Sequence, residues 1–432
     1  MKKALTFCCL ATLLLVLPPA PAGTASARVF DLDPGTRLVV VEDHRVPLVH
    51  LQIDFPAGRD APWVRGHHVD TAFRAQFYDP AGRLRRRADE LGVNLGLRTS
   101  DRVSTLSVSF LRDDLEPTLD LVRKVLGNDD FDRRELRRWR QSASVSWKFQ
   151  LKNPHFRLRQ AQMRLLFQPD DPRVRAVERP PKISTKIEAL RRARDTLLRL
   201  PGRVVGFAGA ITAEDARAAA RGLLPPLLEE PPEGVEPTYL PAAPRTGRPA
   251  RVRVRLPRLT QVYFALTRES LTDDDPRYPA LMLADHALGG YFFSRLYRAL
   301  RHEGGETYGA RSSGLGGVVS TGYALGTFTR TANADHTERK LRRVLEQFHH
   351  DGISEDERSL AAAALRGRRL RRVQDPARRL AEAMDDLRHN RRPGFRDRLV
   401  EAAARVSLEQ VNQVIEEFYD PDDFTMVRVE PR

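Results

Sequence analysis

The chain has 432 residues, of which 41% are hydrophobic and 30% are charged, and its formal net charge is +15 at pH 7. This length predicts two or three domains, and the share of apolar residues excludes an intrinsically disordered chain. The arginines are scattered through segments that also carry acidic residues, as in RKLRRVLEQFHHDGISEDERSL, without a basic tract that holds interleaved aromatic residues. The charge therefore favours an acidic partner or a mildly anionic peptide, and we expect no binding to nucleic acid.

The first 27 residues are predicted to be a secretory signal peptide. Two lysines precede the apolar run ALTFCCLATLLLVL, which is too short to span a bilayer, and PPAPAGTASA offers cleavage after Ala22 or Ala27. Cys8 and Cys9 are the only cysteines and lie inside this segment, so the mature chain would hold no disulfide and no thiolate ligand. We expect an exported protein, periplasmic or secreted, without stable membrane insertion after cleavage. An uncleaved membrane anchor is the alternative.

Strand-like and helical patterns alternate along the next 200 residues. Apolar residues alternate with polar ones in the segment 28–58, in STLSVSFLR and in GRVVGFAGA, which predicts strands. Helical periodicity predicts helices near 66–78, 81–91, 115–127, 132–147, 155–168 and 184–198, and a further helix that begins at Thr212. These elements define an N-terminal domain over residues 28–224.

Residues 225–249 are dense in proline and without periodicity, which predicts an extended linker. Beyond the linker the same kinds of element return in the same order. Strands are predicted over 251–267, 321–331 and 423–431, and helices over 276–288, 335–350, 355–373, 376–390 and 407–418. The sequence therefore predicts an α+β fold of two homologous repeats, each a mostly antiparallel sheet with helices packed on one face, the second repeat covering residues 250–432.

Four stretches resemble the pitrilysin/insulinase metallopeptidase family, whose zinc motif is the inverted H-x-x-E-H. They are residues 35–62, RRRADELGVNLGLRTSDRVSTLSVSFL, GRVVGFAGAITAEDARAAARGLL and, most specifically, LGGYFFSRLYRALRHEGGETYGARSS. The resemblance extends over nearly the whole mature chain. It implies a two-repeat member that forms one half of a clamshell.

The zinc motif itself is missing from the segment VRGHHVDTAFRAQF. Aligned with the family on its glycine, this segment places Val69 and Phe73 at the two histidine positions and Ala72 at the glutamate position. None of these side chains can bind zinc or transfer a proton. The later glutamate ligand is missing as well, because residues 136–169 contain no Asp or Glu. We therefore expect no metal and no cofactor in this chain.

Other registers do not restore the motif. Starting at His67 keeps an acid at Asp70 but places Thr71 where the second histidine is needed, and starting at His68 loses both. His67 and His68 are about 100° apart around a helix and cannot share one ion without distortion. A relocated metal site that uses His67 and Asp70 remains the alternative.

The second repeat keeps a motif of its own in LRHEGGETYG, where Tyr308 follows Arg301 by seven residues. The resemblance implies that such a pair holds the substrate backbone and stabilises the oxyanion of the tetrahedral intermediate. A guanidinium and a phenol are suitable donors for developing negative charge. The alternative interpretation is an ordinary surface arginine and an ordinary strand tyrosine.

Other polar groups predict structural roles. His286, near the end of an apolar helix, is expected in the core or at an interface, and His349 and His350 are expected at the C-terminal end of a helix. The three aspartates 273–275 precede a proline that opens a helix, which is typical of capping.

The function that the resemblance implies is that of a zinc-less peptidase subunit. Such a chain would supply Arg301 and Tyr308 to a homologous partner subunit that carries the zinc, in a heterodimer or larger complex acting on a peptide or an unfolded protein. The alternative is a non-catalytic peptide-binding or scaffold pseudopeptidase of the cell envelope.

Overall fold

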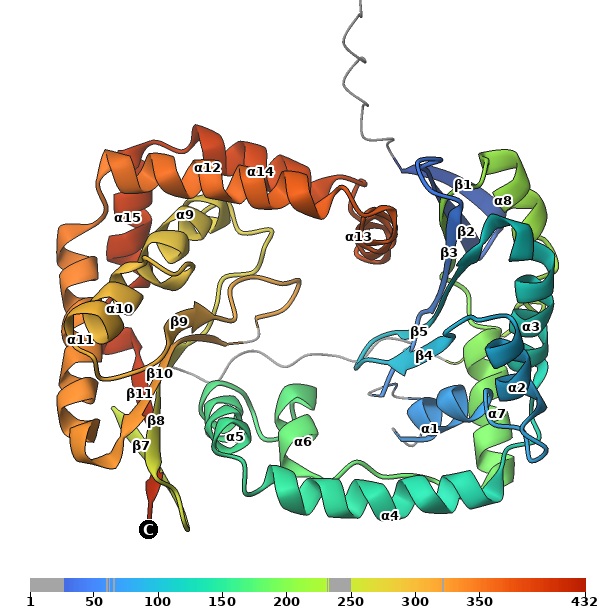
Figure 1. Cartoon of the computed structure of the whole chain (residues 1–432), viewed down its shortest axis with the longest axis horizontal. Coiled ribbons are helices and arrows are strands. Elements are labelled where there is room, and N and C mark those ends of the chain that lie inside the picture. Colours follow the sequence, from blue (N-terminus) through green and yellow to red (C-terminus); the bar gives the residue numbers. More distant parts are fainter. Residues whose placement is uncertain are drawn as a thin grey trace, which may run out of the picture.

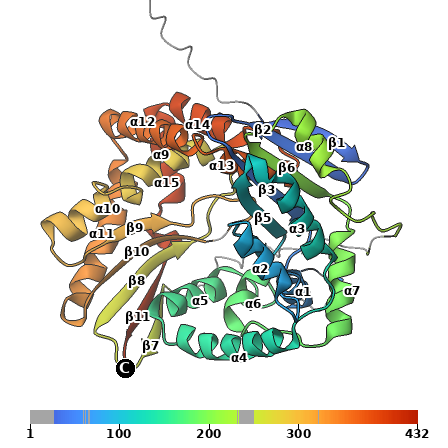
Figure 2. The ribbon, with the colours of Figure 1, turned by 45° about the vertical axis from the view of Figure 1, so that its right-hand side comes forward.

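The computed structural model describes residues 27–59, 61, 63–64, 67–230, 232, 250–320 and 322–432. All of the expected signal peptide except Ala27, and most of the expected linker, lie outside these residues. Two sheets with their helices form the two halves of the molecule, which face each other across its centre (Figure 1, Figure 2). No described helix combines the length and the apolar character needed to cross a membrane.

The first sheet has the strand order β1-β2-β6-β3-β5-β4. Its strands are β1 (Arg28–Asp33), β2 (Thr36–Glu42), β3 (Leu48–Phe55), β4 (Gly96–Thr99), β5 (Ser104–Leu111) and β6 (Arg203–Gly209). All neighbours are antiparallel except β2 and β6, which run parallel.

The second sheet repeats this topology. Its strands are β7 (Arg251–Leu256), β8 (Gln261–Arg268), β9 (Ala310–Ser313), β10 (Tyr323–Arg330) and β11 (Thr425–Pro431). Their order β7-β11-β8-β10-β9 matches β2-β6-β3-β5-β4, and the parallel pair β7·β11 corresponds to β2·β6. Only β1 has no counterpart among the described strands. The expected fold of two homologous repeats is confirmed.

Helices of each half cover one face of its own sheet, except for α5 and α13, which pack on the sheet of the other half. The first half contains α1 (His67–Ala75), α2 (Arg83–Glu90), α3 (Leu115–Gly127), α4 (Arg133–Gln150), α5 (Pro154–Leu166), α6 (Pro172–Glu178), α7 (Ile187–Leu198) and α8 (Ala213–Ala220). The second half contains α9 (Tyr278–Gly289), α10 (Arg295–Tyr297), α11 (Ala334–Asp351), α12 (Glu355–Arg372), α13 (Pro376–Arg388), α14 (Phe395–Arg405) and α15 (Leu408–Phe418). Each sheet and its own helices enclose a separate hydrophobic core.

The two halves exchange one helix each, which the sequence did not predict. Helix α4 leads from the first half to α5, which packs on β7, β8 and β11, while α12 runs the other way and delivers α13 to β2, β3 and β6 (Figure 1). The paired helices have equal lengths, 18 residues for α4 and α12 and 13 for α5 and α13. Both α5 and α13 begin with a proline after a side-chain cap, from Asn153 and Asp375 respectively. Each half therefore supplies one helix that packs on the sheet of the other half.

The contact of α13 with the first sheet is apolar in the middle and ionic around it. Leu380 and Met384 pack against Val39 and Val204. Arg388 reaches the buried carboxylate of Asp54, with Nη1 3.1 Å from Oδ2.

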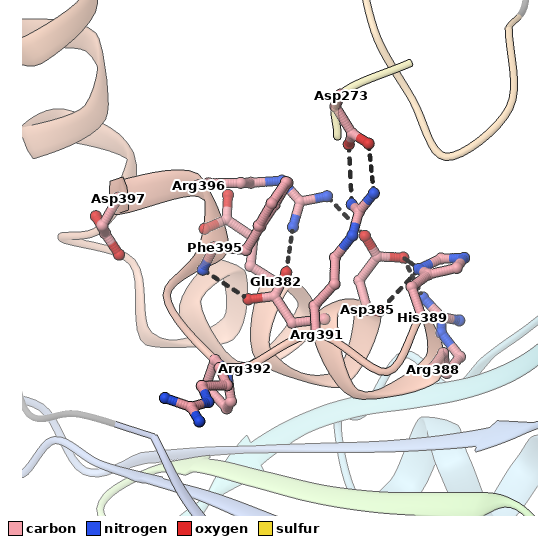
Figure 3. A network of polar contacts seen from close by, with 12 residues as sticks. Asp273, Glu382, Asp385, Arg388, His389, Arg391, Arg392, Phe395, Arg396 and Asp397 are labelled. Atoms are coloured by element: carbon pink, nitrogen blue, oxygen red, sulfur yellow. Dashed lines mark hydrogen bonds and ion pairs between the residues drawn. The ribbon is translucent and has the colours of Figure 1, made fainter. Parts of the chain in front are cut away.

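The C-terminal end of α13 is held by a polar network (Figure 3). Asp385 accepts a hydrogen bond from Arg396 at 2.6 Å, and the buried carboxylate of Asp386 accepts one from the backbone N–H of Phe395 at 3.2 Å. Arg391 forms a bidentate pair with Asp273 on the loop before α9. These contacts fix the turn between α13 and α14 to the rest of the second half. Asp273 is thus an ion-pair partner, and Asp275 accepts a hydrogen bond from the N–H of Arg277 at 2.9 Å. The N-cap of α9 is Arg277 and receives no side-chain cap, so the expected capping by these aspartates is wrong.

Several element predictions needed correction. The strand expected over 251–267 is two strands, because the chain turns at Arg258, whose φ is +60°. Helices α6 and α14 and the short strands β4 and β9 were not predicted. β4 and β9 have only four residues each, too few to show alternation, and α14 starts from Gly394 in the left-handed region within a segment rich in arginine and proline.

Candidate functional site: the Arg301–Tyr308 pair and a cavity on the second sheet

The three degenerate zinc-motif positions are part of the hydrophobic core. Val69, Ala72 and Phe73 on α1 have no exposed surface. The ring of Phe73 packs edge-on against Phe55 on β3, with 5.6 Å between the ring centroids. The helix face that binds zinc in active relatives is therefore packed against the first sheet, and its residues do not fit a zinc ion.

The neighbouring polar residues are engaged elsewhere. The carboxylate of Asp70 accepts a hydrogen bond from Arg74, one turn further along α1, at 2.9 Å. The side chain of His67 lies outside the described part of the chain. On α4, Glu135 accepts from the indole N–H of Trp139 at 2.9 Å, and no other acid follows on this helix. Within the described ranges, no three His, Cys, Asp or Glu side chains cluster in a way that could hold a metal ion.

Arg301 and Tyr308 lie in direct contact. Nη1 of Arg301 donates a hydrogen bond to the backbone carbonyl of Tyr308 at 2.6 Å. The guanidinium also lies over the rings of Tyr297 and Tyr308, 5.4 and 5.6 Å from their centroids. The side chain of Arg301 is thus oriented by the residue with which it was paired in the sequence.

Local backbone geometry brings the two residues together. Arg301 lies in a π-helix, Arg298–Glu303, a rare conformation that is frequent at functional sites. Gly305 follows with φ at +61°, where a side chain would be strained. The chain then enters β9 at Ala310. The glycine therefore supplies the reversal between helix and strand that the pair needs.

The pair belongs to an exposed aromatic surface. Tyr308 is 73% exposed, and its hydroxyl makes no hydrogen bond with the described residues. Phe292 and Phe293, which are 53% and 60% exposed, contact each other and His302. Exposed aromatic side chains with a nearby arginine are typical of binding surfaces.

A cavity of about 650 Å³ opens beside this surface, on the face of the second sheet that α5 partly covers. Strands β8, β9 and β10 form its floor, and the segment between α9 and α10 forms one wall. Its aromatic lining consists of Tyr263, Phe264, Tyr291, Phe292, Tyr297 and Phe328. Neither Arg301 nor Tyr308 lines the cavity, but Phe292 belongs to both sites.

Asp285 places a carboxyl group in this cavity. The hydroxyl of Tyr323 donates to its Oδ1 at 2.8 Å, and Tyr323 in turn lies 3.2 Å from the hydroxyl of Tyr419. Burial raises the pKa of the Asp285 carboxyl, and the hydrogen bond from Tyr323 and the charge of Arg368 oppose this only partly. A carboxyl group, two arginines (Arg311 and Arg368) and aromatic walls suit a peptide ligand.

His286, next to Asp285, is buried as expected, with 3% of its surface exposed. Burial and the nearby Arg368 lower the pKa of His286 to about 4, so the imidazole is neutral at physiological pH. Sequence analysis singled out the histidine and missed the aspartate. The sequence did contain a signal, because the aspartate lies inside the apolar run MLADHALGG. Burying a carboxylate there costs free energy unless it is paired or hydrogen-bonded.

Comparisons with known proteins give a family match for part of the chain and a similar fold for the whole. Residues 185–365 match the family model described as "Peptidase M16 inactive domain". No curated protein matches the chain. A solved peptidase M16 inactive domain from Pseudomonas fluorescens is 20% identical, with a TM-score of 0.77, over 94% of this chain and 98% of that one. Residues 185–365 thus match an M16, or pitrilysin, domain, and the chain as a whole shares the fold of the solved M16 inactive domain. The prediction of a member without the zinc motif is therefore confirmed.

Two further solved structures share the fold and differ from each other in length. A protease from Helicobacter pylori is 13% identical, with a TM-score of 0.78, over 94% of this chain and 100% of that one. The periplasmic protease PqqL from Escherichia coli is 14% identical, with a TM-score of 0.72, over 100% of this chain but only 49% of PqqL. This chain therefore corresponds in fold to one half of the PqqL chain.

Proposed function

We propose that this chain is the zinc-less subunit of an exported peptidase complex and supplies Arg301 and Tyr308 to a homologous subunit that carries the zinc. The observation that carries the proposal is the pair itself. An arginine oriented by a direct hydrogen bond stands beside a phenol that is 73% exposed and has no intramolecular partner among the described residues. A structural tyrosine would bury its ring and satisfy its hydroxyl.

The pair's chemistry suits the transition state of peptide hydrolysis. The guanidinium of Arg301 and the phenol of Tyr308 can both donate hydrogen bonds to an oxyanion. Two donors aimed at an oxyanion are worth about 3 kcal/mol each in water-excluded sites. In the free subunit the surface is open, so the partner subunit has to provide the exclusion of water. Export of the complex is expected from the leader segment, and the periplasmic relative of similar fold is consistent with it.

The first prediction concerns cleavage by the complex. We expect the double change Arg301→Ala and Tyr308→Phe to lower kcat of the complex with the zinc-bearing subunit by about 100-fold or more, because both oxyanion donors are lost. The assay is cleavage of a fluorogenic peptide by the co-purified complex. Arg298→Ala, an exposed arginine on the same π-helix, is the matched control and should leave kcat unchanged. An unchanged kcat in the double variant, with the complex intact, would show that the pair has no role in the chemistry.

A second candidate function is peptide binding without chemistry, and the 650 Å³ cavity favours it. On this alternative the chain alone would bind unfolded peptides in the cavity beneath α5. Gly326→Trp, on the cavity floor, should then abolish binding of a fluorescent unfolded peptide, whereas Arg301→Ala should not. Dependence of cleavage on Arg301 would support the role as a zinc-less subunit. Peptide binding that is lost in Gly326→Trp but kept in Arg301→Ala would support the binding function.

A further inference from the structure

Within the described part of the chain, one edge of the second sheet, at β7, is unpaired. Among the described strands β7 pairs only with β11. The N–H of Met426 donates to the carbonyl of Ala250 at 3.0 Å, and that of Arg432 donates to Leu256 at 3.1 Å. Even-numbered residues of β7 thus turn their backbone groups towards β11. Because alternate residues of a parallel strand point to opposite sides, residues 251, 253 and 255 direct theirs out of the sheet.

The first half shows what the fold can hold at this position. There the corresponding edge, on β2, is covered by β1, which pairs antiparallel with it from Arg28↔Val40 to Asp33↔Thr36. Ala27, just before β1, packs against the apolar cluster beneath α13. In the second half α5 takes the place of α13. No described residue takes the place of β1.

A groove occupies the equivalent space in the second half. It is a cavity of about 460 Å³ between α5 and residues 252–255 of β7. Val252 and Val254 belong to its β7 side, and Gln160, Ala161 and Leu165 line it from α5. A strand added to β7 would therefore lie under α5, as β1 lies beside α13.

The groove is basic. Arg157 and Arg164 line it from α5, and Arg253 and Arg255 line it from β7. Arg164 is engaged by Glu178, and Arg255 lies 3.8 Å from Glu430. Arg253 forms no ion pair in the described ranges, and the buried Nε of Arg157 has no hydrogen-bond partner there. Arg253 and Arg157 interact only through charge with Asp335 and Glu178, and no acidic side chain among the described residues lines the groove, so its lining is positively charged.

We propose that the free edge of β7, with this groove, binds an extended acidic segment of a partner polypeptide as an added antiparallel strand. The backbone groups of residues 251, 253 and 255 supply the ladder of hydrogen bonds, as in other cases of strand addition. Side chains of the added strand that face α5 meet Arg157 and Arg164, so this face of the strand favours carboxylates. The opposite face lies beside Arg253 and the acid Asp335, and it does not select for charge. This interface is separate from the surface of Arg301 and Tyr308 and does not depend on their role.

The test measures binding of two fluorescein-labelled decapeptides to the full chain by fluorescence anisotropy. One peptide alternates Glu and Val, and the other alternates Lys and Val as the control for charge. We expect the acidic peptide to bind at least tenfold more tightly than the basic one. Arg253→Pro removes an outward N–H that β11 does not use, so it should weaken binding about tenfold while melting temperature stays unchanged. Arg253→Ala removes only the charge and should have a smaller effect. Arg221→Glu, on an exposed site of the first half, is the control for net charge and should have none.

Hydrogen exchange provides the second measurement. The amides of residues 251, 253 and 255 should exchange rapidly in the chain alone and slowly with the acidic peptide bound. Protection in the chain alone would show that the chain's own residues already cover the edge, and the proposal would fail. Equal affinity for both peptides, or full binding by Arg253→Pro, would also overturn it. Peptide binding should persist in the Arg301→Ala and Tyr308→Phe variant, so failure here is distinguishable from failure of the cleavage role.

Discussion

Phe73 stands on α1 where active relatives carry a histidine, and its ring is fully buried against Phe55. Loss of this ring would leave a cavity in the first core. We predict that Phe73→Ala lowers the free energy of unfolding by about 3–5 kcal/mol. Phe293→Ala, at a ring that is 60% exposed, should change it by less than about 0.5 kcal/mol. Urea titrations followed by circular dichroism measure both, and equal losses would contradict the assignment of Phe73 to the core.

Asp285 gives the chain a specific dependence on pH. Because burial raises its pKa in the folded state, folding favours the protonated carboxyl. The contribution of the protonated Asp285 carboxyl to the free energy of unfolding is therefore complete below the ordinary aspartate pKa of 3.8. It is lost as the pH rises through the raised pKa of the folded state. We predict that Asp285→Asn stabilises the chain at pH 8 by on the order of 1 kcal/mol. The difference in the free energy of unfolding between the variant and the wild type should become smaller towards pH 4, as measured by urea unfolding at each pH. A gap independent of pH would show that Asp285 does not titrate in this range.

At the scale of elements, the crossing of α13 over the first sheet depends on one glycine. A Cβ at Gly206 on β6 would lie 2.5 Å from Sδ of Met384 and 2.7 Å from Cδ1 of Leu380. We predict that Gly206→Ala costs about 1–3 kcal/mol, because α13 has to move away from the sheet. Gly127→Ala, where no atom lies within 4 Å of the new Cβ, is the matched control and should be close to neutral. Thermal melting measures the difference. Equal melting temperatures would mean that α13 is not tightly packed.

Long elements were predicted from the sequence more accurately than short ones. Helices α4, α11 and α12 have 18 residues each and show a clear period, so they were predicted close to their observed bounds. Strand β9 has four residues, and nothing in ARSS distinguishes a strand from a turn. Yet β9 forms the edge of the second sheet and part of the cavity floor. The element least visible in the sequence is therefore one of those closest to the candidate site.

At the scale of the molecule, the exchange of α5 and α13 makes the halves mutually dependent. Without α13, the buried face of Val39, Val41, Val204 and Ala208 in the first sheet would be exposed. We predict that the whole chain unfolds in one transition. The three tryptophans, Trp63, Trp139 and Trp147, all lie in the first half, whereas circular dichroism reports on both. Urea midpoints from tryptophan fluorescence and from ellipticity should therefore coincide. Separate midpoints would show that the halves fold independently.

The sequence by itself determined the two repeats, the family resemblance and the loss of the zinc motif. These follow from local periodicity and from the identity of a few residues, because Val69, Ala72 and Phe73 cannot bind a metal in any fold. The pairing of Arg301 with Tyr308 was implied by the family resemblance, and their direct contact was seen only in the structure, where the π-helix and Gly305 bring them together. Only the tertiary structure decided which faces are covered and which remain open. The exchange of α5 and α13, the carboxyl of Asp285 in the cavity and the free edge of β7 all join segments distant in the chain, and pairing across such distances leaves no periodic signal in the sequence.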